Sequence, residues 1–354
     1  MTTHRAADGP STLKLLVAFA SIYLVWGSTY LAIKFVVETM PPFIMAGARF
    51  LLAGGMLYAW ARWKGAARPT GAQWRATAII GGLLLCGGNG GVVYAEQRVS
   101  SGLTALIVAT VPLWIVVLEW LRPHGTRPTM TVVIGVLLGL AGIGILAGPG
   151  KFAGGESVDP IGTSVLIFAT LSWSVGSLYS RKAKLPGASL LSTGMQMLAG
   201  GVLLSILGTA TGEWSKLNWA GITMKSVLSL AYLVVFGSLI GFTAYTWLLK
   251  VSTPSKVSTY AYVNPVVAVA LGWLLAGEPM NLRTVIAAGV IVTGVVFITR
   301  GKGAKAEAKE VKSGFPVDLA EGEIASGRDA KGCEAGKVCV AAEPVSPARS
   351  TMGC

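Results

Sequence analysis

The sequence predicts an all-α membrane protein whose ten transmembrane helices form two inverted five-helix repeats. Three observations predict this fold: long stretches without charge, an uneven distribution of lysine and arginine, and matching segments in the two halves. Only 13% of the 354 residues are charged, whereas soluble domains carry about 25%. This composition disfavours a soluble enzyme and points to a chain that spends most of its length in lipid.

The charge-free stretches set the number of helices. A helix needs about 20 apolar residues to cross the hydrocarbon core of a bilayer. Ten stretches meet or approach this length: 15–33, 43–61, 76–95, 99–118, 128–150, 160–180, 185–212, 226–249, 257–277 and 284–299. The stretch 43–61 contains one charged residue, Arg49. The first lacks a strongly basic leader and an A-x-A cleavage site, so we expect it to be a retained span.

The basic residues predict the orientation. With a cytoplasmic N-terminus, 13 of the 20 Lys and Arg residues in positions 1–299 fall in cytoplasmic loops and 5 in outer loops. Cytoplasmic loops of membrane proteins are enriched in Lys and Arg, so both termini are predicted to be cytoplasmic. The net charge of +13 is thereby explained by orientation. We expect a lipid bilayer as partner, and no nucleic acid.

Matching segments indicate an internal duplication. Four matches recur in the same order at offsets of 146 to 153 residues: 26–30 with 175–179, 52–55 with 198–201, 99–101 before Pro112 with 251–253 before Pro265, and Gly142 with Gly294. The sequence LAGG at 52–55 is identical at 198–201. Because five spans is an odd number, the second copy enters the membrane from the opposite side. Inverted repeats are typical of secondary transporters.

The predicted organisation has five parts: a cytoplasmic N-terminus (1–13), repeat one (14–148), a linker (149–159), repeat two (160–299) and a disordered cytoplasmic tail (300–354). A short helix near 303–312 is compatible with this tail. Three of the four cysteines lie in the tail, at 333, 339 and 354. Their spacing matches neither a disulfide framework nor a metal-ligand pattern, and we expect no metal and no cofactor.

Several motifs resemble one known family. Residues 26–28 (WGS) with Lys34, 41–42 (PP) and 48–54 (ARFLLAG) resemble the start of an EamA domain, and Pro265, 272–275 (GWLL) and 277–278 (GE) resemble the end of a second one. The segments 87–90, 95–97 and 111–114 are similar to the YedA-like exporters within this family of the drug/metabolite transporter superfamily.

The resemblance covers residues 13–300. It implies a bacterial inner-membrane protein with a central cavity that exports small metabolites, amino acids or amphiphilic drugs by alternating access.

Three charged residues near or within spans are candidates for function. Lys34 lies near the outer end of the first span and Arg49 lies seven residues into the second. An intramembrane charge costs about 2.5–3.5 kcal/mol on insertion scales unless it is paired or hydrated. We therefore expect Arg49 to face substrate, backbone carbonyls, Glu38 or Glu96. Lys34 is either a helix-end anchor or a cavity residue. Glu96, with Glu119 at the inner end of the fourth span, is a candidate carboxylate for proton coupling, or a loop residue.

The predicted substrate site combines one amide and several aromatic residues. Asn89 lies within a glycine run at 87–91, where it either faces the cavity or belongs to close helix packing. Aromatic side chains form either interfacial belts or a cavity wall that suits apolar or cationic groups. The predicted substrate-binding residues are Trp26, Tyr30, Asn89, Trp114, Trp173, Tyr179, Tyr260 and Asn264.

Pro112 and Pro265 occupy equivalent places in spans four and nine. Each removes a backbone hydrogen bond, and we expect a hinge or a static kink there. Asn264 is placed to satisfy the carbonyl freed by Pro265 or to contact substrate.

Two other classes of protein remain as alternatives. A membrane-embedded enzyme is disfavoured because both histidines, at positions 4 and 124, lie in loops and no catalytic motif is present. A channel is disfavoured because there is no ring of charge or carbonyl filter motif. The oligomeric state is left open between monomer and homodimer.

Overall fold

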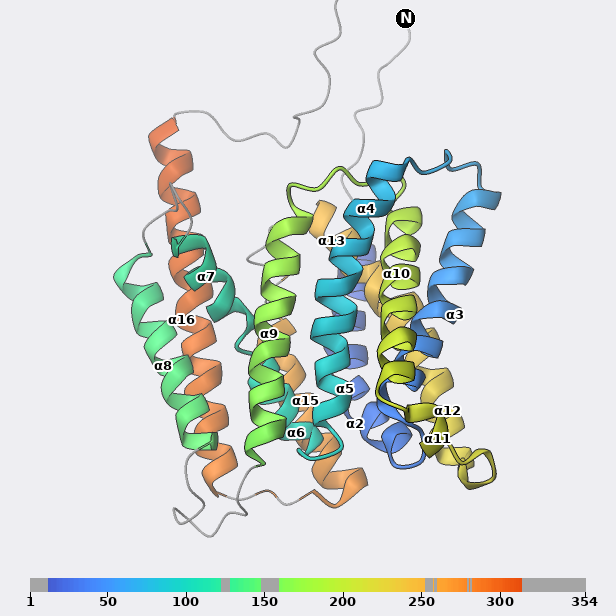
Figure 1. The fold of residues 1–354 in the computed structure, drawn as a ribbon. Helices are drawn as coiled ribbons and strands as arrows, with labels where there is room; N and C mark the ends of the chain where they lie inside the picture. The colour runs from blue at the N-terminus through green and yellow to red at the C-terminus, as the bar shows by residue number, and fades with distance from the viewer. Residues whose placement is uncertain are drawn as a thin grey trace, which may run out of the picture. The chain divides into compact units, whose positions relative to one another are not determined.

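A computed structural model describes residues 12–121, 128–147, 159–251, 257, 260–278, 280 and 282–313 (Figure 1). Regular secondary structure in these ranges is helical throughout. Residues 1–11 of the expected cytoplasmic N-terminus, nearly all of the linker and the tail beyond residue 313, with its three cysteines, lie outside the described residues.

The described residues of the first half form ten helical segments. They are α1 (Thr12–Ala20), η1 (Ser21–Val25), α2 (Trp26–Val37), α3 (Pro42–Trp63), α4 (Gly71–Ile80), η2 (Gly81–Asn89), α5 (Gly90–Ala95), α6 (Ser101–Val108), α7 (Val111–Leu121) and α8 (Met130–Ala147). Several are continuous in space, so that α1, η1 and α2 form one long helix, as do α4, η2 and α5.

The second half repeats this pattern with two short additions. Its segments are α9 (Pro160–Ser180), α10 (Ser189–Ala210), α11 (Glu213–Lys216), η3 (Trp219–Gly221), α12 (Met224–Tyr232), η4 (Leu233–Phe242), α13 (Thr243–Val251), α15 (Tyr260–Ala276) and α16 (Leu282–Ser313). Helix α16 continues through residue 313, so residues 300–313 are helical where the sequence predicted disorder. The short helix expected near 303–312 lies within it.

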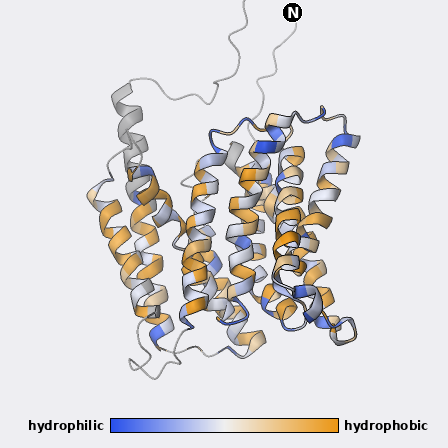
Figure 2. Cartoon of the chain, viewed as in Figure 1, coloured by the Kyte–Doolittle hydropathy of each residue, from blue (hydrophilic) through white to orange (hydrophobic). Residues whose placement is uncertain are grey.

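Seven helices in the described ranges are long and apolar enough to cross a membrane: Thr12–Val37, Pro42–Trp63, Gly71–Ala95, Ser101–Leu121, Pro160–Ser180, Ser189–Ala210 and Met224–Leu248. Three shorter apolar helices cover Met130–Gly142, Val263–Ala276 and Leu282–Ile298. Hydrophobic residues run along the helices in Figure 2, and hydrophilic ones gather mainly at their ends.

Glycines bring α3 and α10 into close contact. A Cβ atom on Gly54 would lie 2.8 Å from the backbone nitrogen of Leu198, and one on Gly201 would lie 2.9 Å from that of Leu51. Small residues let membrane helices approach each other in this way. The two copies of the LAGG sequence therefore lie on helices that pack directly against one another.

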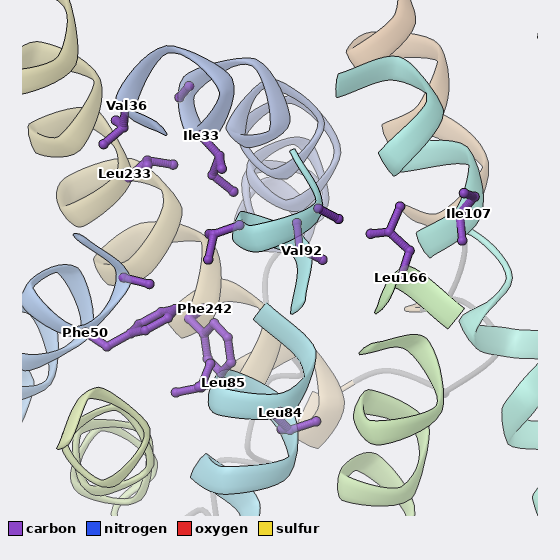
Figure 3. Close-up of a cluster of buried hydrophobic side chains, with 14 of the residues drawn as sticks. Ile33, Val36, Phe50, Leu84, Leu85, Val92, Ile107, Leu166, Leu233 and Phe242 are labelled. Atoms are coloured by element: carbon purple, nitrogen blue, oxygen red, sulfur yellow. The ribbon is translucent and has the colours of Figure 1, made fainter. Parts of the chain in front are cut away.

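Clusters of buried side chains hold the helices together. The main cluster includes Phe50, Leu85 and Phe242, whose side chains lie close together in Figure 3. A separate cluster joins α7, α8 and α16, which lie side by side in Figure 1, through Leu113, Val116, Val132 and Ile298.

Two glutamates of the second half hold the beginnings of helices in the first half. Glu213 accepts hydrogen bonds from the backbone nitrogens of Phe43 and Ile44 at 3.3 and 2.9 Å, at the start of α3. Glu278 accepts from the Ser101 nitrogen at 2.7 Å and from the Ser101 hydroxyl at 2.9 Å, at the start of α6. Unpaired N–H groups at a helix N-terminus favour a carboxylate partner. The Gly277-Glu278 motif therefore stabilises the N-terminus of α6.

Candidate functional site

A central cavity of about 730 Å³, including the space at its mouth, lies among the helices. Its walls come from α2, α3, α5, α6, α7, α9, α15 and the π-helical segments η2 and η4. The lining residues are Trp26, Thr29, Tyr30, Ile33, Arg49, Phe50, Gly88, Asn89, Val92, Val108, Val111, Ala169, Thr170, Trp173, Phe242, Tyr260 and Asn264.

The π-helical segments place backbone and side chains at this cavity. Segments η2 and η4 interrupt the third and eighth predicted spans at corresponding positions in the two halves of the sequence. Segment η2 contributes Gly88 and Asn89 to the lining, and η4 contributes Phe242. Segments with π-helical geometry are frequent at functional sites, because the extra residue per turn redirects side chains.

Trp26 lies at the centre of an aromatic wall. Its ring centroid is 5.4 Å from that of Tyr260, 5.9 Å from that of Phe242 and 6.4 Å from that of Trp173. The rings of Tyr260 and Trp173 meet it edge to face. These four residues come from four predicted spans, so the wall forms only when the helices assemble. The Trp26 indole also donates to the Gly237 carbonyl at 3.3 Å.

Arg49 is a buried cation in the cavity lining, with 4% of its surface exposed. Its Nε donates to the Ser238 hydroxyl at 2.8 Å, and its guanidinium lies 4.8 Å from the centre of the Phe50 ring. Its Nη1 has no hydrogen-bond partner within the described part of the chain. The main polar partner is thus Ser238, rather than the carbonyls, Glu38 or Glu96 that we expected. A Cβ on Gly237 would lie 2.9 Å from Nη2, so this glycine makes room for the guanidinium.

Asn89 and Asn264 differ in how they are satisfied. The Asn89 side-chain oxygen is buried and has no partner among the described residues. The Asn264 amide nitrogen, oriented toward three carbonyls, lies 3.2, 3.0 and 3.3 Å from the oxygens of Ile22, Tyr23 and Tyr260. Asn264 therefore ties α15 to η1, whereas Asn89 offers an unused acceptor to the cavity.

Lys34 and Glu96 lie next to each other, outside the lining. The Lys34 ammonium donates to the Glu96 backbone oxygen at 3.1 Å. Glu96 is fully buried, and neither carboxylate oxygen has a partner in the described ranges. Val92, one helical turn before Glu96, and Ile33, next to Lys34, both line the cavity. The pair thus lies directly beyond its wall.

Trp114 and Tyr179 are not among the lining residues, contrary to the grouping that we predicted. Trp114 packs with Leu113 and Val116 in the cluster that joins α7 to α8 and α16. Tyr179 packs against the main buried cluster. It follows Trp173 by six residues, which is about 9 Å along a helix. Both lie on helices that contribute other residues to the lining, but their own side chains pack elsewhere.

The two prolines occupy different local structures. Pro112 is the second residue of α7, which begins directly after a turn at Ala109 and Thr110 that separates it from α6. Pro265 lies inside α15, which continues without interruption. Span four is therefore broken next to the cavity residues Val108 and Val111, whereas its counterpart is not.

Sequence reasoning missed several lining or supporting residues. Phe242, Phe50 and Thr170 line the cavity, and Ser238 holds Arg49. Ser238 carries the one hydroxyl in the segment Leu233–Phe242. A lone polar side chain in an apolar span is the signal that would have identified it. In the described ranges, no group of three or more His, Cys, Asp or Glu residues is arranged to hold a metal ion.

Residues 13–148 and 160–300 both match the EamA-like transporter family. The chain belongs to this family. A 40% identical relative is the "Uncharacterized inner membrane transporter YedA" of Escherichia coli K12, with 82% of this chain and 92% of the relative covered. The "Uncharacterized transporter YvbV" of Bacillus subtilis is 28% identical over 83% of this chain and 94% of its own length.

A plant relative and a solved structure extend these likenesses. The "WAT1-related protein At3g02690, chloroplastic" of Arabidopsis thaliana is 25% identical, covering 84% of this chain and 72% of the relative. A crystal structure superposes with a TM-score of 0.58 at 22% identity, covering 86% of this chain and all of the other. This EamA-like protein is thus a multi-pass inner-membrane transporter, which confirms the predicted family and class.

Proposed function

We propose that this transporter exports small amphiphilic organic molecules that carry an anionic group, amino acids among them, by alternating access. One observation carries the proposal: Arg49 lines the central cavity and has an Nη1 donor without a partner in the described ranges. A substrate carboxylate would supply the missing acceptor.

The electrostatics of the cavity favour this substrate class over cations. A buried donor without a partner loses its hydration, and hydrogen bonds to charged groups contribute about 1.5–3 kcal/mol. A carboxylate would regain this energy, whereas a cationic group would be repelled by Arg49 in a medium of low dielectric constant. Among the substrates predicted from the sequence, amino acids and acidic metabolites are therefore favoured over cationic amphiphilic drugs.

The remaining cavity groups suit the rest of such a molecule. The Asn89 oxygen would accept a hydrogen bond from an ammonium or hydroxyl group. The Trp26, Trp173, Phe242 and Tyr260 rings offer an apolar surface for the body of the substrate. We assign a binding role to the predicted residues Trp26, Tyr30, Asn89, Trp173 and Tyr260 together with Arg49, and a supporting role to Asn264.

In this proposal the ten spans form two inverted repeats, an arrangement typical of transporters that work by alternating access. The contact between the two LAGG helices and the matching positions of η2 and η4 support this symmetry. We assign the main hinge to the broken helix at Pro112, with Pro265 as its counterpart. Both termini are placed in the cytoplasm from the distribution of Lys and Arg.

Reconstitution into proteoliposomes tests the proposal. Vesicles preloaded with unlabelled L-phenylalanine should take up the labelled compound by counterflow, with saturation. Labelled tetraphenylphosphonium, a hydrophobic cation, should not be exchanged. Counterflow of the cation alone would contradict the proposed substrate class, and flux that neither saturates nor shows counterflow would indicate a channel.

A further inference from the structure

Glu96 is a buried carboxyl group that the cavity itself does not use. None of its surface is exposed, and both side-chain oxygens lack a hydrogen-bond partner in the described part of the chain. Taking a carboxylate out of water without hydrogen bonds costs so much free energy that the group is normally neutralised. A side chain in this position therefore binds a proton unless a cation moves next to it.

The surroundings of Glu96 contain such a cation. Lys34 on α2 already donates to the Glu96 backbone oxygen at 3.1 Å, and Arg49 on α3 acts on Glu96 electrostatically. Glu278 acts on it as a like charge, and Tyr30 on α2 also interacts with it. Two further segments that pack against α5, namely α9 and η2, contribute only Tyr179 and Cys86 as titratable residues.

These contacts define two arrangements of one pair. With Glu96 protonated, Lys34 remains on the backbone oxygen, as in the structure. With Glu96 ionised, a rotation of the flexible Lys34 side chain would pair its ammonium with the carboxylate. Ile33, next to Lys34, and Val92, one helical turn before Glu96, both line the cavity. A change in the shape of the cavity would therefore move Lys34 and Glu96 relative to each other and favour one of the two arrangements.

We propose that Glu96 is a proton-binding site that couples proton movement to transport, with Lys34 as its positioning residue. The inference rests on the proposed export function and names its driving ion. One proton binds to the carboxylate from the outer side and leaves toward the cytoplasm as substrate moves outward. No other bond is formed or broken.

Infrared spectroscopy tests proton binding without any substrate. Purified wild-type protein should show the C=O stretch of a protonated carboxyl, and this band should be lost as the pH is raised. This band should be absent from Glu96→Gln and retained in the control Glu38→Gln, because Glu38 is a partly exposed residue paired with Lys225. A band that persists in Glu96→Gln, or its absence from the wild type at every pH at which the protein stays folded, would overturn the assignment.

Transport of L-phenylalanine tests the coupling. A proton gradient should drive accumulation by wild type and by Glu38→Gln, whereas Glu96→Gln should lose accumulation and keep counterflow, which needs no net proton movement. Glu96→Asp, which retains a carboxyl, should accumulate substrate with a shifted pH profile. Gradient-driven accumulation by Glu96→Gln would refute the coupling. Absence of counterflow in the wild type would instead refute export of this substrate, and the infrared result would stand.

Discussion

Replacing Arg49 by glutamine tests the substrate site most directly. The change removes the cation from the cavity while keeping a side chain that reaches toward Ser238. Of the Arg49 guanidinium nitrogens, Nε already donates a hydrogen bond to Ser238, and Nη1 is the donor left for substrate. The loss is therefore expected to correspond to one hydrogen bond to a charged group, about 1.5–3 kcal/mol. That energy equals a loss of affinity of about 10- to 150-fold.

A matched pair of probes separates charge from shape. N-acetyl-L-phenylalanine carries a carboxylate, and N-acetyl-L-phenylalaninamide has nearly the same shape without the charge. Both are measured as competitors of labelled L-phenylalanine counterflow. Arg49→Gln should weaken the anionic competitor by the factor above and leave the neutral one nearly unchanged. Equal effects on both competitors, or none on the anion, would refute the role of Arg49 in binding.

A second buried arginine provides the control. Arg283 has 6% of its surface exposed and donates to the Ile145 carbonyl at 2.6 Å, and it is not among the cavity-lining residues. Arg283→Gln removes a buried cation of the same kind without touching the cavity. It should change the thermal unfolding of the protein in detergent, but not the ratio between the two competitors.

Three further predictions concern supporting groups. Gly237→Ala should displace the Arg49 guanidinium and weaken binding of the anionic competitor, whereas Gly55→Ala, whose Cβ would meet nothing within 4 Å, should not. Glu278→Gln should destabilise the protein by about 1.5–3 kcal/mol in detergent unfolding, because it removes the charge that accepts the hydrogen bonds at the start of α6. The Gly162 backbone nitrogen donates a hydrogen bond to Asp159 and lowers the pKa of its carboxyl group. The stability that Asp159 contributes is therefore present above pH about 4 and is lost as the pH falls further. If Asp159→Asn left the loss of stability at acidic pH unchanged, this prediction would be contradicted.

The predicted membrane segments depended on composition alone and were therefore accessible from the sequence. Uncharged stretches correspond to the long apolar helices, and the Gly-Glu motif correctly pointed to the family. The sequence also identified Arg49 as a buried charge that needs a polar partner, because the cost of an isolated charge in lipid does not depend on the fold.

The identity of contacting residues was not accessible in the same way. Arg49 contacts Ser238, although 189 residues separate them, and no periodicity in either helix predicts that pairing. Trp114 and Trp26 are both aromatic residues within apolar segments, yet one packs toward α8 and α16 and the other lines the cavity. A helix turns about 100° per residue, so small differences in its rotation or position decide which side chains meet.

The sequence by itself determined the family, the transporter class and the set of polar residues that the apolar segments retain. The family and the transporter class follow from residues that match the motifs of known members, and the retained polar residues stand out because placing charge in lipid is costly. Only the tertiary structure decided that Arg49 and Asn89 share one cavity, and that Glu96 lies beyond its wall beside Lys34. Such groupings depend on how separate helices rotate and pack against each other, because these side chains come from three different helices.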